Sequence, residues 1–191
     1  MNYRLSINTA PTTEPCTLAE VRARLRLPST VTTDDTMIEN ILIPGARATC
    51  EAWCRRAFIS QKWNLHLDHQ PSLIELPLGY VTEVDSVKTL DDDGSTETTE
   101  SSTTAYHVAT GEDARIFLRN GGSWTSTTRA VDVMHIIYTV GWASAAAVPK
   151  EIKQAVIDLA AYWYENPEAA ESDEIPGTIK RGLQRWKIYK V

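Results

Sequence analysis

Apolar and polar residues alternate with helical spacing in the first part of the chain. The segment TLAE at residues 17–20 matches a capping box, in which the threonine hydroxyl and the glutamate carboxylate bond free backbone amides at a helix start. Apolar residues then recur every three or four positions until Pro28. We therefore expect the first ordered element of the chain to be a short helix that begins at Thr17.

A second helical pattern runs from the acidic pair Asp34-Asp35 to about Arg56, and either aspartate is placed to cap it. Pro44-Gly45 interrupts the pattern. Because an interior proline costs about 3 kcal/mol and kinks the axis, we expect a bent helix or two short ones. The broad apolar face of this helix consists of Met37, Ile38, Ile41, Leu42, Ala48, Ala52 and Trp53.

The same helix has a second apolar side. Residues placed 100° apart bring three further apolar residues together, away from the broad face. A later helix that starts near Pro149 also has two apolar stripes. Since a helix that is apolar on two sides needs two packing partners, we expect one partner to be the protein's own core and the other a neighbouring subunit. The predicted subunit-interface residues are Ile43, Cys50, Cys54, Ile157, Ala161 and Tyr164.

Between residues 59 and 140 the period changes to two. In ISQKWNLHLD, at residues 59–68, alternate positions are largely apolar, which predicts a half-buried strand. Five further strand-like runs come after it, separated by proline and glycine. The acid-rich stretch at residues 91–104 reads as a polar turn and loop. Because this block lies between helical segments and does not alternate with them, the fold class is α+β, a helical framework with an inserted antiparallel β region.

This pattern divides the chain into three segments. We expect an N-terminal arm and helices over residues 1–58, an antiparallel β module over residues 59–142, and C-terminal helices with a basic tail over residues 143–191. The N-terminal and C-terminal helices are expected to pack as one domain.

One stretch has the composition of a metal site. Cys50 and Cys54 lie one helical turn apart, and His66 and His69 come after them. In a continuing strand these two histidines face opposite sides, whereas a zinc finger needs both on one helical face. We therefore expect no metal site, with the cysteines as small buried residues and the histidines on the surface.

Composition and charge exclude several classes of protein. A formal net charge of −6 argues against general affinity for nucleic acid, which needs concentrated positive charge. Three cysteines, an odd number, fit a reducing cytosol better than a disulfide framework. No apolar run approaches the ~20 residues that span a bilayer, so no membrane association is expected.

The last residues of the chain carry a different charge from the rest. From residue 178 onwards there are five basic side chains and no acidic one, with aromatic residues among them. Two interpretations stay open: a frayed, solvated terminus, or an electrostatic handle for a partner. The handle would consist of Arg185, Trp186, Lys187, Ile188, Tyr189 and Lys190.

The sequence contains no recognised catalytic constellation. It has no nucleophile elbow, phosphate-binding loop, dinucleotide-binding motif or H-E-x-x-H metal motif. His135 sits between apolar residues, and Asp91–Asp93 lie in a predicted flexible turn that would not position a general acid or base. We therefore expect no enzymatic activity and no cofactor.

The order of these motifs resembles a known family. Thr17–Glu20, Asp34-Asp35, Arg56-Ala57 and Gln61–Leu65, followed by IIYTVGW and VPKEIKQAVIDLAAYWYENPEA, are similar to the head–tail connector (adaptor, or head-completion) proteins of long-tailed bacteriophages and gene transfer agents. The resemblance covers roughly residues 17–170. The chain departs from the family pattern at Pro44-Gly45, where alanines are expected.

This resemblance implies a structural virion protein. Connector subunits form a ring, commonly of twelve copies, that docks under the portal protein, extends the DNA channel and provides the attachment surface for head-closure or tail-terminator proteins. The implied location is the head–tail junction of the virion, and the host cytoplasm during assembly, where the chain is expected to be monomeric. Acidic loops facing the lumen would let packaged DNA slide through without sequence-specific binding, and the basic tail would be an arm that orders when it binds the portal.

Two other functions stay open. The chain could be a monomeric β-rich binding module with helical flanks, for instance for carbohydrate, with an aromatic platform from Trp124, Trp142 or Tyr106. It could also be a hydrolase with an unrecognised site in the β region. Particle size distinguishes the ring-forming connector from these two monomeric alternatives.

Overall fold

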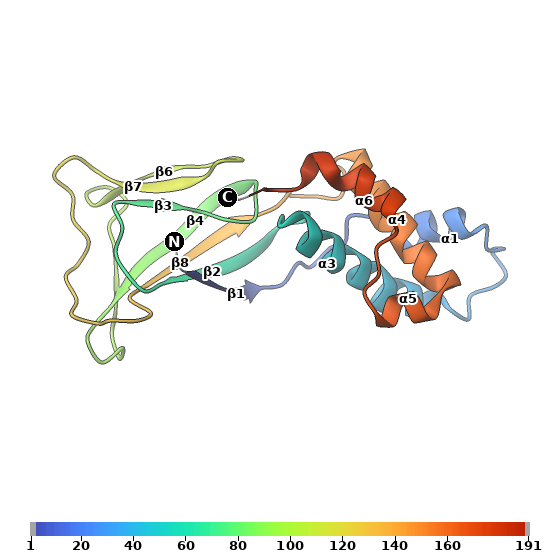
Figure 1. The fold of residues 1–191 in the computed structure, drawn as a ribbon, viewed down its shortest axis with the longest axis horizontal. Helices are drawn as coiled ribbons and strands as arrows, with labels where there is room; N and C mark the ends of the chain where they lie inside the picture. Colours follow the sequence, from blue (N-terminus) through green and yellow to red (C-terminus); the bar gives the residue numbers. More distant parts are fainter. Residues whose placement is uncertain (1–2, 190–191) are drawn as a thin grey trace. The chain divides into compact units, whose positions relative to one another are not determined.

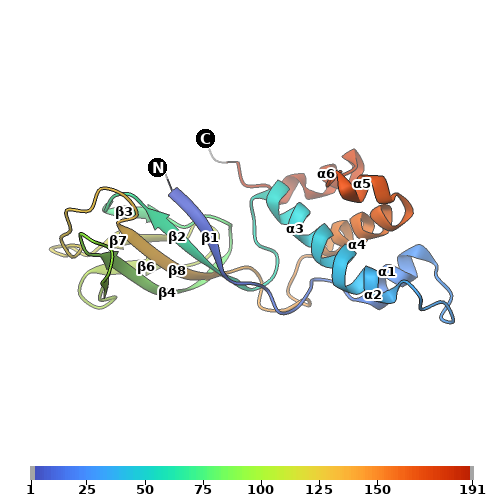
Figure 2. The ribbon, with the colours of Figure 1, turned by 90° about the horizontal axis from the view of Figure 1, so that it is seen from below.

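The chain forms two compact units, shown in Figures 1 and 2. The computed structural model describes residues 3–189. Within these, the β unit comprises residues 3–11 and 60–141, and the helical unit comprises residues 12–59 and 142–189. The predicted α+β class, a helical framework with an antiparallel β region, is confirmed. None of the helices in the described part of the chain is long and apolar enough to cross a membrane.

The larger sheet of the β unit has five antiparallel strands, in the order β1-β2-β8-β4-β5. The predicted alternation is present in β2, where Leu65 and Leu67 are fully buried while His66 between them points to the opposite face. The bounds of these strands are Tyr3–Thr9 for β1, Gln61–Leu67 for β2, Val81–Leu90 for β4, Glu97–Thr99 for β5 and Met134–Val140 for β8.

A second sheet of three antiparallel strands, in the order β3-β7-β6, completes the β unit. Ile74 and Ile116, which are cross-strand neighbours in β3 and β7, are fully buried. The Tyr138 hydroxyl of β8 donates a hydrogen bond of 3.2 Å to the Pro77 carbonyl, just after β3. The bounds are Leu73–Glu75 for β3, Tyr106–Ala109 for β6 and Arg115–Leu118 for β7.

Two strands depart from the sequence-based prediction. The first ordered element is strand β1 and not the helix at Thr17, so the N-terminal arm belongs to the β unit. Six of its seven residues are exposed, although Tyr3, Leu5 and Ile7 alternate with polar residues as in a half-buried strand. Strand β5 lies inside the acid-rich stretch expected to be a loop, and an Asp91 carboxylate oxygen accepts a 3.1 Å hydrogen bond from the Thr96 amide in the preceding turn.

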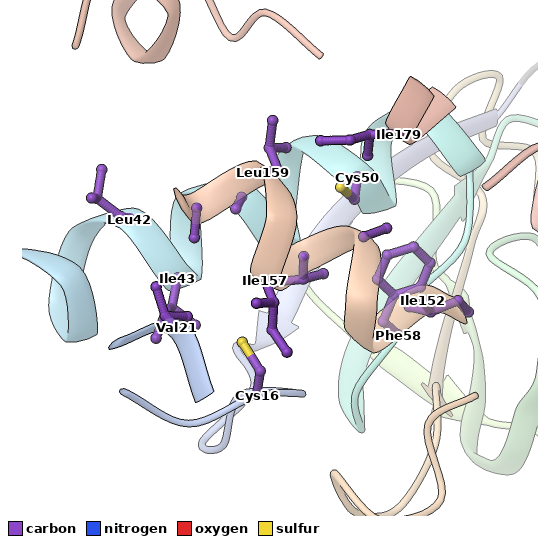
Figure 3. Packing of buried hydrophobic residues seen from close by; sticks show 14 of the residues in the cluster. Cys16, Val21, Leu42, Ile43, Cys50, Phe58, Ile152, Ile157, Leu159 and Ile179 are labelled. Carbon is purple, nitrogen blue, oxygen red and sulfur yellow. The ribbon is translucent and has the colours of Figure 1, made fainter. Parts of the chain in front are cut away.

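Helix α4 (Lys150–Glu165) is the centre of the helical unit. Both of its predicted apolar stripes are buried, and it contacts the other helices α1, α3, α5 and α6 (Figure 3). A helix with two apolar stripes is stable only when both stripes are covered, and its exposed residues, such as Glu151 and Gln154, are polar. The surrounding helices are α1 (Leu18–Leu25), α3 (Ile43–Cys54), α5 (Pro167–Glu171), α6 (Gly177–Leu183) and the 3₁₀ turn η2 (Gln184–Trp186).

The predicted capping box starts α1. The Thr17 hydroxyl accepts a hydrogen bond from the Glu20 amide at 3.3 Å, and a Glu20 carboxylate oxygen accepts one from the Thr17 amide at 2.8 Å. Glu20 also pairs with Lys153 of α4 at 2.6 Å, which ties the start of α1 to the central helix. The helix ends at Arg26, which adopts a left-handed conformation with φ of 56°.

The second helix is continuous but not regular. Helix α2 (Asp35–Met37) passes into a π-helical segment, η1 (Ile38–Leu42), and then into α3. Pro44 lies in the first turn of α3, where its missing amide hydrogen is tolerated. The expected interruption at Pro44-Gly45 is therefore a π-helical segment just before the proline. Gly45 lets α3 approach α4, because a Cβ atom there would lie 3.3 Å from the Trp163 ring.

We predict that Thr17→Ala lowers the free energy of unfolding of the helical unit by about 1 kcal/mol, because the Glu20 amide loses its side-chain acceptor. Urea unfolding followed by far-ultraviolet circular dichroism measures this loss. Thr13→Ala, at an exposed position outside the helices, is the matched control and should leave the midpoint unchanged. Equal midpoints for the two variants would show that the capping box does not contribute.

Candidate interaction surfaces

The residues predicted to face a neighbouring subunit lie inside the helical unit (Figure 3). Those on α3 are at most 1% exposed, and two of the three on α4 are less than 9% exposed. Ile43, Cys50, Cys54 and Ile157 belong to one buried cluster with residues of α1 and α6. The prediction that this side of each helix is free for a second copy is therefore wrong for Ile43, Cys50, Cys54, Ile157 and Ala161.

The π-helical segment explains the error on the second helix. Each residue of a π-helix turns by about 80°, and not by the 100° of an α-helix, so five such residues rotate the remainder of the helix by about a quarter turn. With this rotation Ile43 and Cys50 move onto the side of Ile38 and Leu42, and all four are buried. A helical wheel drawn from the sequence as a regular α-helix has no such rotation.

The opposite side of this helix is an exposed apolar surface. Ile41 is 64% exposed and Met37 is 40% exposed, and alanines at helical spacing continue the surface along α3. We call this surface the outer helix face. It consists of Met37, Ile41, Ala48 and Ala52, all of which the sequence pattern assigned to the broad apolar face.

A groove lies beside the end of the outer helix face. It has a volume of about 650 Å³ and runs between α3 and the segment that joins α5 to α6. Ala52 and Trp53 form its apolar side, and Asp173 and Glu174 bring acidic groups to its other side. The outer helix face and the groove are adjacent through Ala52, so together they offer apolar and acidic contacts to one partner.

Tyr164, the sixth predicted interface residue, is half-buried and bonded within the chain. Its hydroxyl donates a hydrogen bond of 2.7 Å to Asp34. Asp35 forms an ion pair with Arg22 of α1. The two aspartates therefore connect the start of α2 to α4 and α1, and neither side chain caps the helix.

The three cysteines are buried free thiols, as predicted. Burial raises the pKa of Cys16 and of Cys54 to about 12 and raises the pKa of Cys50 further, so all three are protonated at neutral pH. Cys50 and Cys54 belong to the helical unit, whereas His66 belongs to the β unit. The cysteines are therefore core residues.

The end of the described chain is packed against the helical unit. The Ile188 amide donates a hydrogen bond of 2.9 Å to the Cys54 carbonyl, and the Arg56 guanidinium donates one of 3.1 Å to the Trp186 carbonyl. The Trp186 ring stands edge-on to Trp142 at 5.9 Å between ring centres. The prediction of an arm that orders only on binding is therefore wrong for these residues.

Part of the predicted handle still faces solvent. Arg185 is exposed and Tyr189 is 63% exposed, whereas the Lys187 ammonium lies 4.1 Å from the centre of the Trp53 ring. Lys190 lies outside the described residues. The exposed cations near the chain end are therefore those of α6 and η2, at Lys180, Arg181 and Arg185.

The aromatic platform of the carbohydrate-binding alternative is not present. Trp124 is 9% exposed and Tyr106 is 4% exposed, and their rings contact each other at 5.9 Å. The Trp124 indole donates a hydrogen bond of 2.8 Å to the Pro71 carbonyl. Trp142 belongs to the helical unit. These aromatic side chains are packing residues, so the prediction of a platform is wrong.

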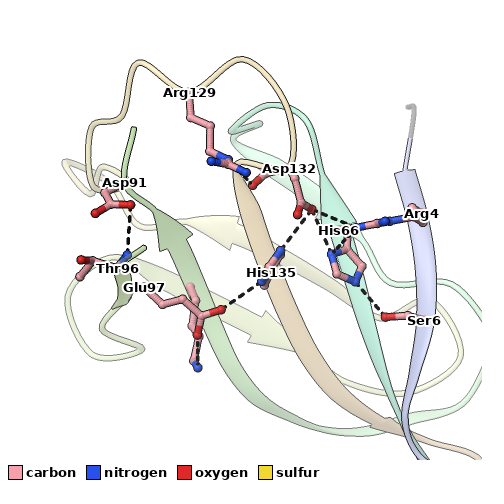
Figure 4. A network of polar contacts seen from close by, with 10 residues as sticks. Arg4, Ser6, His66, Asp91, Thr96, Glu97, Arg129, Asp132 and His135 are labelled. Atoms are coloured by element: carbon pink, nitrogen blue, oxygen red, sulfur yellow. Dashed lines mark hydrogen bonds and ion pairs between the residues drawn. The ribbon is translucent and has the colours of Figure 1, made fainter. Parts of the chain in front are cut away.

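The outward face of the five-stranded sheet carries a cluster of polar residues (Figure 4). His66 of β2 and His135 of β8 are directly paired in the sheet, and their rings meet at 4.5 Å between centres. Asp132, just before β8, places one carboxylate oxygen 3.0 Å from His66 Nδ1 and 3.1 Å from His135 Nε2. The backbone of Asp132 is left-handed, with φ of 54°. His66, which was predicted to be a surface histidine, is therefore part of this cluster, with its side chain 12% exposed.

Other residues hold this cluster in place. Ser6 Oγ of β1 lies 2.8 Å from His66 Nε2, and Glu97 of β5 lies 3.2 Å from His135 Nδ1. Burial lowers the pKa of His66, which keeps its imidazole neutral at pH 7. Although burial alone would raise the pKa of Asp132, its contacts with the two histidines lower it, so the carboxylate is ionised.

The two units together have the features of a structural protein that assembles with other proteins. Among the described residues, the large apolar side chain with the highest exposed fraction, Ile41 at 64%, is on the outer helix face, and an exposed group of cations lies near the chain end. The chain belongs to the head completion protein family, which matches residues 16–179. This confirms the resemblance inferred from the order of its motifs.

Solved structures with the same fold come from gene transfer agent (GTA) particles. The chain is similar to a protein in the neck of an empty GTA particle with C6 symmetry, with a TM-score of 0.80, 24% identity, and coverage of 98% of this chain and 97% of that one. A protein in the virion of a native GTA particle has a TM-score of 0.77 and 25% identity, with coverage of 98% of this chain and 96% of that one. A protein in the neck of a native GTA particle, computed with C12 symmetry, has a TM-score of 0.66 and 22% identity, with coverage of 96% of each chain. None of the curated proteins matches the chain.

Two isoleucines on the same helix test which of its sides is the core. We predict that Ile43→Ala, at a position 1% exposed, lowers the free energy of unfolding by about 2–5 kcal/mol, because it leaves a cavity against α4. Ile41→Ala, at a position 64% exposed, should change it by no more than about 0.5 kcal/mol. Urea unfolding of the isolated protein measures both. A larger loss of stability in Ile41→Ala than in Ile43→Ala would show that the core side is the one that a regular α-helical wheel assigns.

Proposed function

We propose that this protein is a structural head–tail connector that forms a ring under the portal, extends the DNA channel and presents an attachment surface for head-closure or tail-terminator proteins. Membership of the head completion family and the similarity to GTA neck proteins support this role. The expected location, the head–tail junction of the virion, agrees with the neck and virion particles from which the similar structures come. The role requires no catalysis and no cofactor.

The observation that carries the proposal is the outer helix face. A cyclic ring is built from one heterologous contact repeated around an axis, so each subunit needs a surface that its own core does not use. Ile41 and Met37 supply exposed apolar side chains in the helical unit, and the alanines of α3 let a neighbour approach the helix closely. We propose that this face, and not the buried Ile43 side, contacts the adjacent subunit.

The number of subunits in the ring is proposed by analogy. One of the similar neck structures was computed with C12 symmetry, which supports a ring of twelve copies. A single contact as small as four side chains is weak without additional partners. We therefore propose that the chain is monomeric before assembly and that the portal protein brings the copies together.

Electrostatics support a lumen through which DNA slides. From residue 82 to residue 113 the β unit has nine acidic side chains and one lysine, Lys88. The hydrogen bond from the Thr96 amide lowers the pKa of the Asp91 carboxyl, and hydrogen bonds from the side chain and the amide of Thr128 lower the pKa of Asp92. Both carboxyls stay ionised and repel phosphate. We propose that this acidic surface faces the packaged DNA and contacts it without sequence specificity.

The cations near the chain end are the proposed contact to the portal. Lys180, Arg181 and Arg185 are exposed, whereas Trp186 and Ile188 are fixed on the helical unit. A cationic patch anchored in this way keeps its shape before binding, which limits the entropy lost on docking. The proposed docking surface therefore shares Arg185 with the handle predicted from the sequence and extends from it into α6.

We predict that particles produced without this protein have DNA-filled heads and no attached tails. Wild-type protein supplied in trans should restore tails, and Ile41→Glu should not, because a buried unpaired carboxylate at the subunit contact prevents ring closure. Electron microscopy of the particles gives the fraction with tails.

Val108→Glu is the matched control for this experiment. Val108 is a 38% exposed apolar residue in β6 of the β unit, so its replacement adds the same charge away from the proposed contact. It should restore tails as the wild type does. Tailed particles in the absence of the protein would contradict the connector role. Full rescue by a folded Ile41→Glu variant would contradict only the proposed subunit interface.

We predict that the double variant Arg181→Glu/Arg185→Glu binds purified portal at least tenfold more weakly than the wild type, with a smaller dependence on salt, because two attractive charges become repulsive. Biolayer interferometry at two ionic strengths measures both effects. Lys150→Glu reverses an exposed cation at the start of α4 and should bind as the wild type does. Equal affinity of all three proteins for the portal would contradict the proposed portal contact.

A further inference from the structure

We propose that His66, Asp132 and His135 form a binding site for a divalent transition-metal ion such as Zn²⁺. This proposal is independent of the connector role and concerns the β unit alone. Within residues 3–189 these three side chains are the group whose ligand atoms converge, with all three atoms within 4.8 Å of one another. The arrangement is seen in Figure 4.

The distances suit a metal site. In a tetrahedral site with ligand bonds of about 2.0–2.1 Å, neighbouring ligand atoms are about 3.3 Å apart. Asp132 Oδ1 lies 3.0 Å from His66 Nδ1 and 3.1 Å from His135 Nε2. Two imidazole nitrogens and one carboxylate oxygen are a donor set that favours Zn²⁺ and similar first-row ions over Mg²⁺ and Ca²⁺. A small adjustment of the side chains would bring all three donors onto one ion.

One ligand atom has no other role in the fold. His135 Nε2 is buried and forms no geometrically sound hydrogen bond, and its close polar neighbour is the Asp132 carboxylate oxygen at 3.1 Å. A buried nitrogen without a hydrogen bond costs about 1–3 kcal/mol. Coordination of a metal ion by this nitrogen would remove the cost.

The surrounding residues orient the ligands as in known metal sites. A histidine that binds a metal usually donates its other ring N–H to a carboxylate or hydroxyl, which fixes its tautomer. His66 Nε2 faces Ser6 Oγ at 2.8 Å, and His135 Nδ1 faces a Glu97 carboxylate oxygen at 3.2 Å. Each histidine therefore has one nitrogen held by a neighbour and the other directed at Asp132.

The position of Asp132 is also fixed. Its left-handed backbone is uncommon for a residue other than glycine, although aspartate tolerates it better than most. Its amide donates a hydrogen bond of 2.9 Å to Asp68, and the Arg129 guanidinium donates one of 3.1 Å to its carbonyl. These contacts hold the turn before β8 so that the carboxylate points at both histidines.

Arg4 is the one group that opposes the metal ion. Its Nη2 atom lies 3.2 Å from His66 Nδ1 and 3.5 Å from Asp132, so it occupies part of the place of the ion. Its side chain is 68% exposed and can turn into solvent. A cavity of about 390 Å³ beside His66 and Asp132 gives the ion access and leaves room for a water molecule as a fourth ligand.

The site predicts an ordered set of affinities for Zn²⁺. Isothermal titration calorimetry of the full chain, after removal of metals with a chelator, should give one site per chain. His66→Ala and His135→Ala should each weaken binding at least tenfold, and Ser6→Ala should weaken it by about tenfold. His69→Ala, an exposed histidine in the same unit, is the matched control and should bind as the wild type does.

Two further measurements keep the test independent of folding and of the cysteines. Arg4→Ala should bind Zn²⁺ more tightly than the wild type, a gain that misfolding does not produce. Co²⁺ in place of Zn²⁺ should give visible absorption without the near-ultraviolet band of thiolate ligands. Absence of saturable Zn²⁺ binding, binding unchanged in both histidine variants, or a thiolate band would each overturn the proposal.

Discussion

The enclosure of helix α4 is the constraint on which the helical unit depends. This helix has two apolar stripes, so chain segments that lie before and after it in the sequence must cover both of them. Helix α3 can cover it closely only where Gly45 leaves space for the Trp163 ring. Once Ile43 and Cys50 are committed to α4, the other side of the same helix has no partner within the unit. The outer helix face is thus exposed because the opposite side of the same helix is used to pack the core.

Much of this fold can be predicted from the sequence. The capping box at Thr17, the strand alternation around Leu65 and the two apolar sides of the second helix are local patterns, and the structure has all three. Which of those two sides is the core could not be predicted, because the π-helical turn before Pro44 rotates the helix and leaves no mark in an α-helical wheel. Strand β1 was missed although Tyr3, Leu5 and Ile7 alternate with polar residues, which is a strand pattern visible in the sequence.

The polar cluster on the sheet shows a different limit of sequence analysis. His66 and His135 are far apart in the sequence, and only the register of β2 against β8 places them side by side. Asp132 joins them because its left-handed backbone turns the chain just before β8. Neither the register nor that turn can be derived from residue types alone. A search for metal ligands by spacing considers neighbours such as Cys50, Cys54 and His69, which the structure separates from this cluster.

The bridge between Ile59 and Trp142 bears on how such a chain can diverge. These two residues flank the long β segment on either side, and the helical unit holds them next to each other, with the Trp142 amide 3.4 Å from the Phe58 carbonyl. The intervening β segment therefore leaves the helical unit and re-enters it at neighbouring points. Replacement of that segment would also take away β2, the partner of β1 in the N-terminal arm, so the arm and the segment would have to change together while the helical unit keeps its own core.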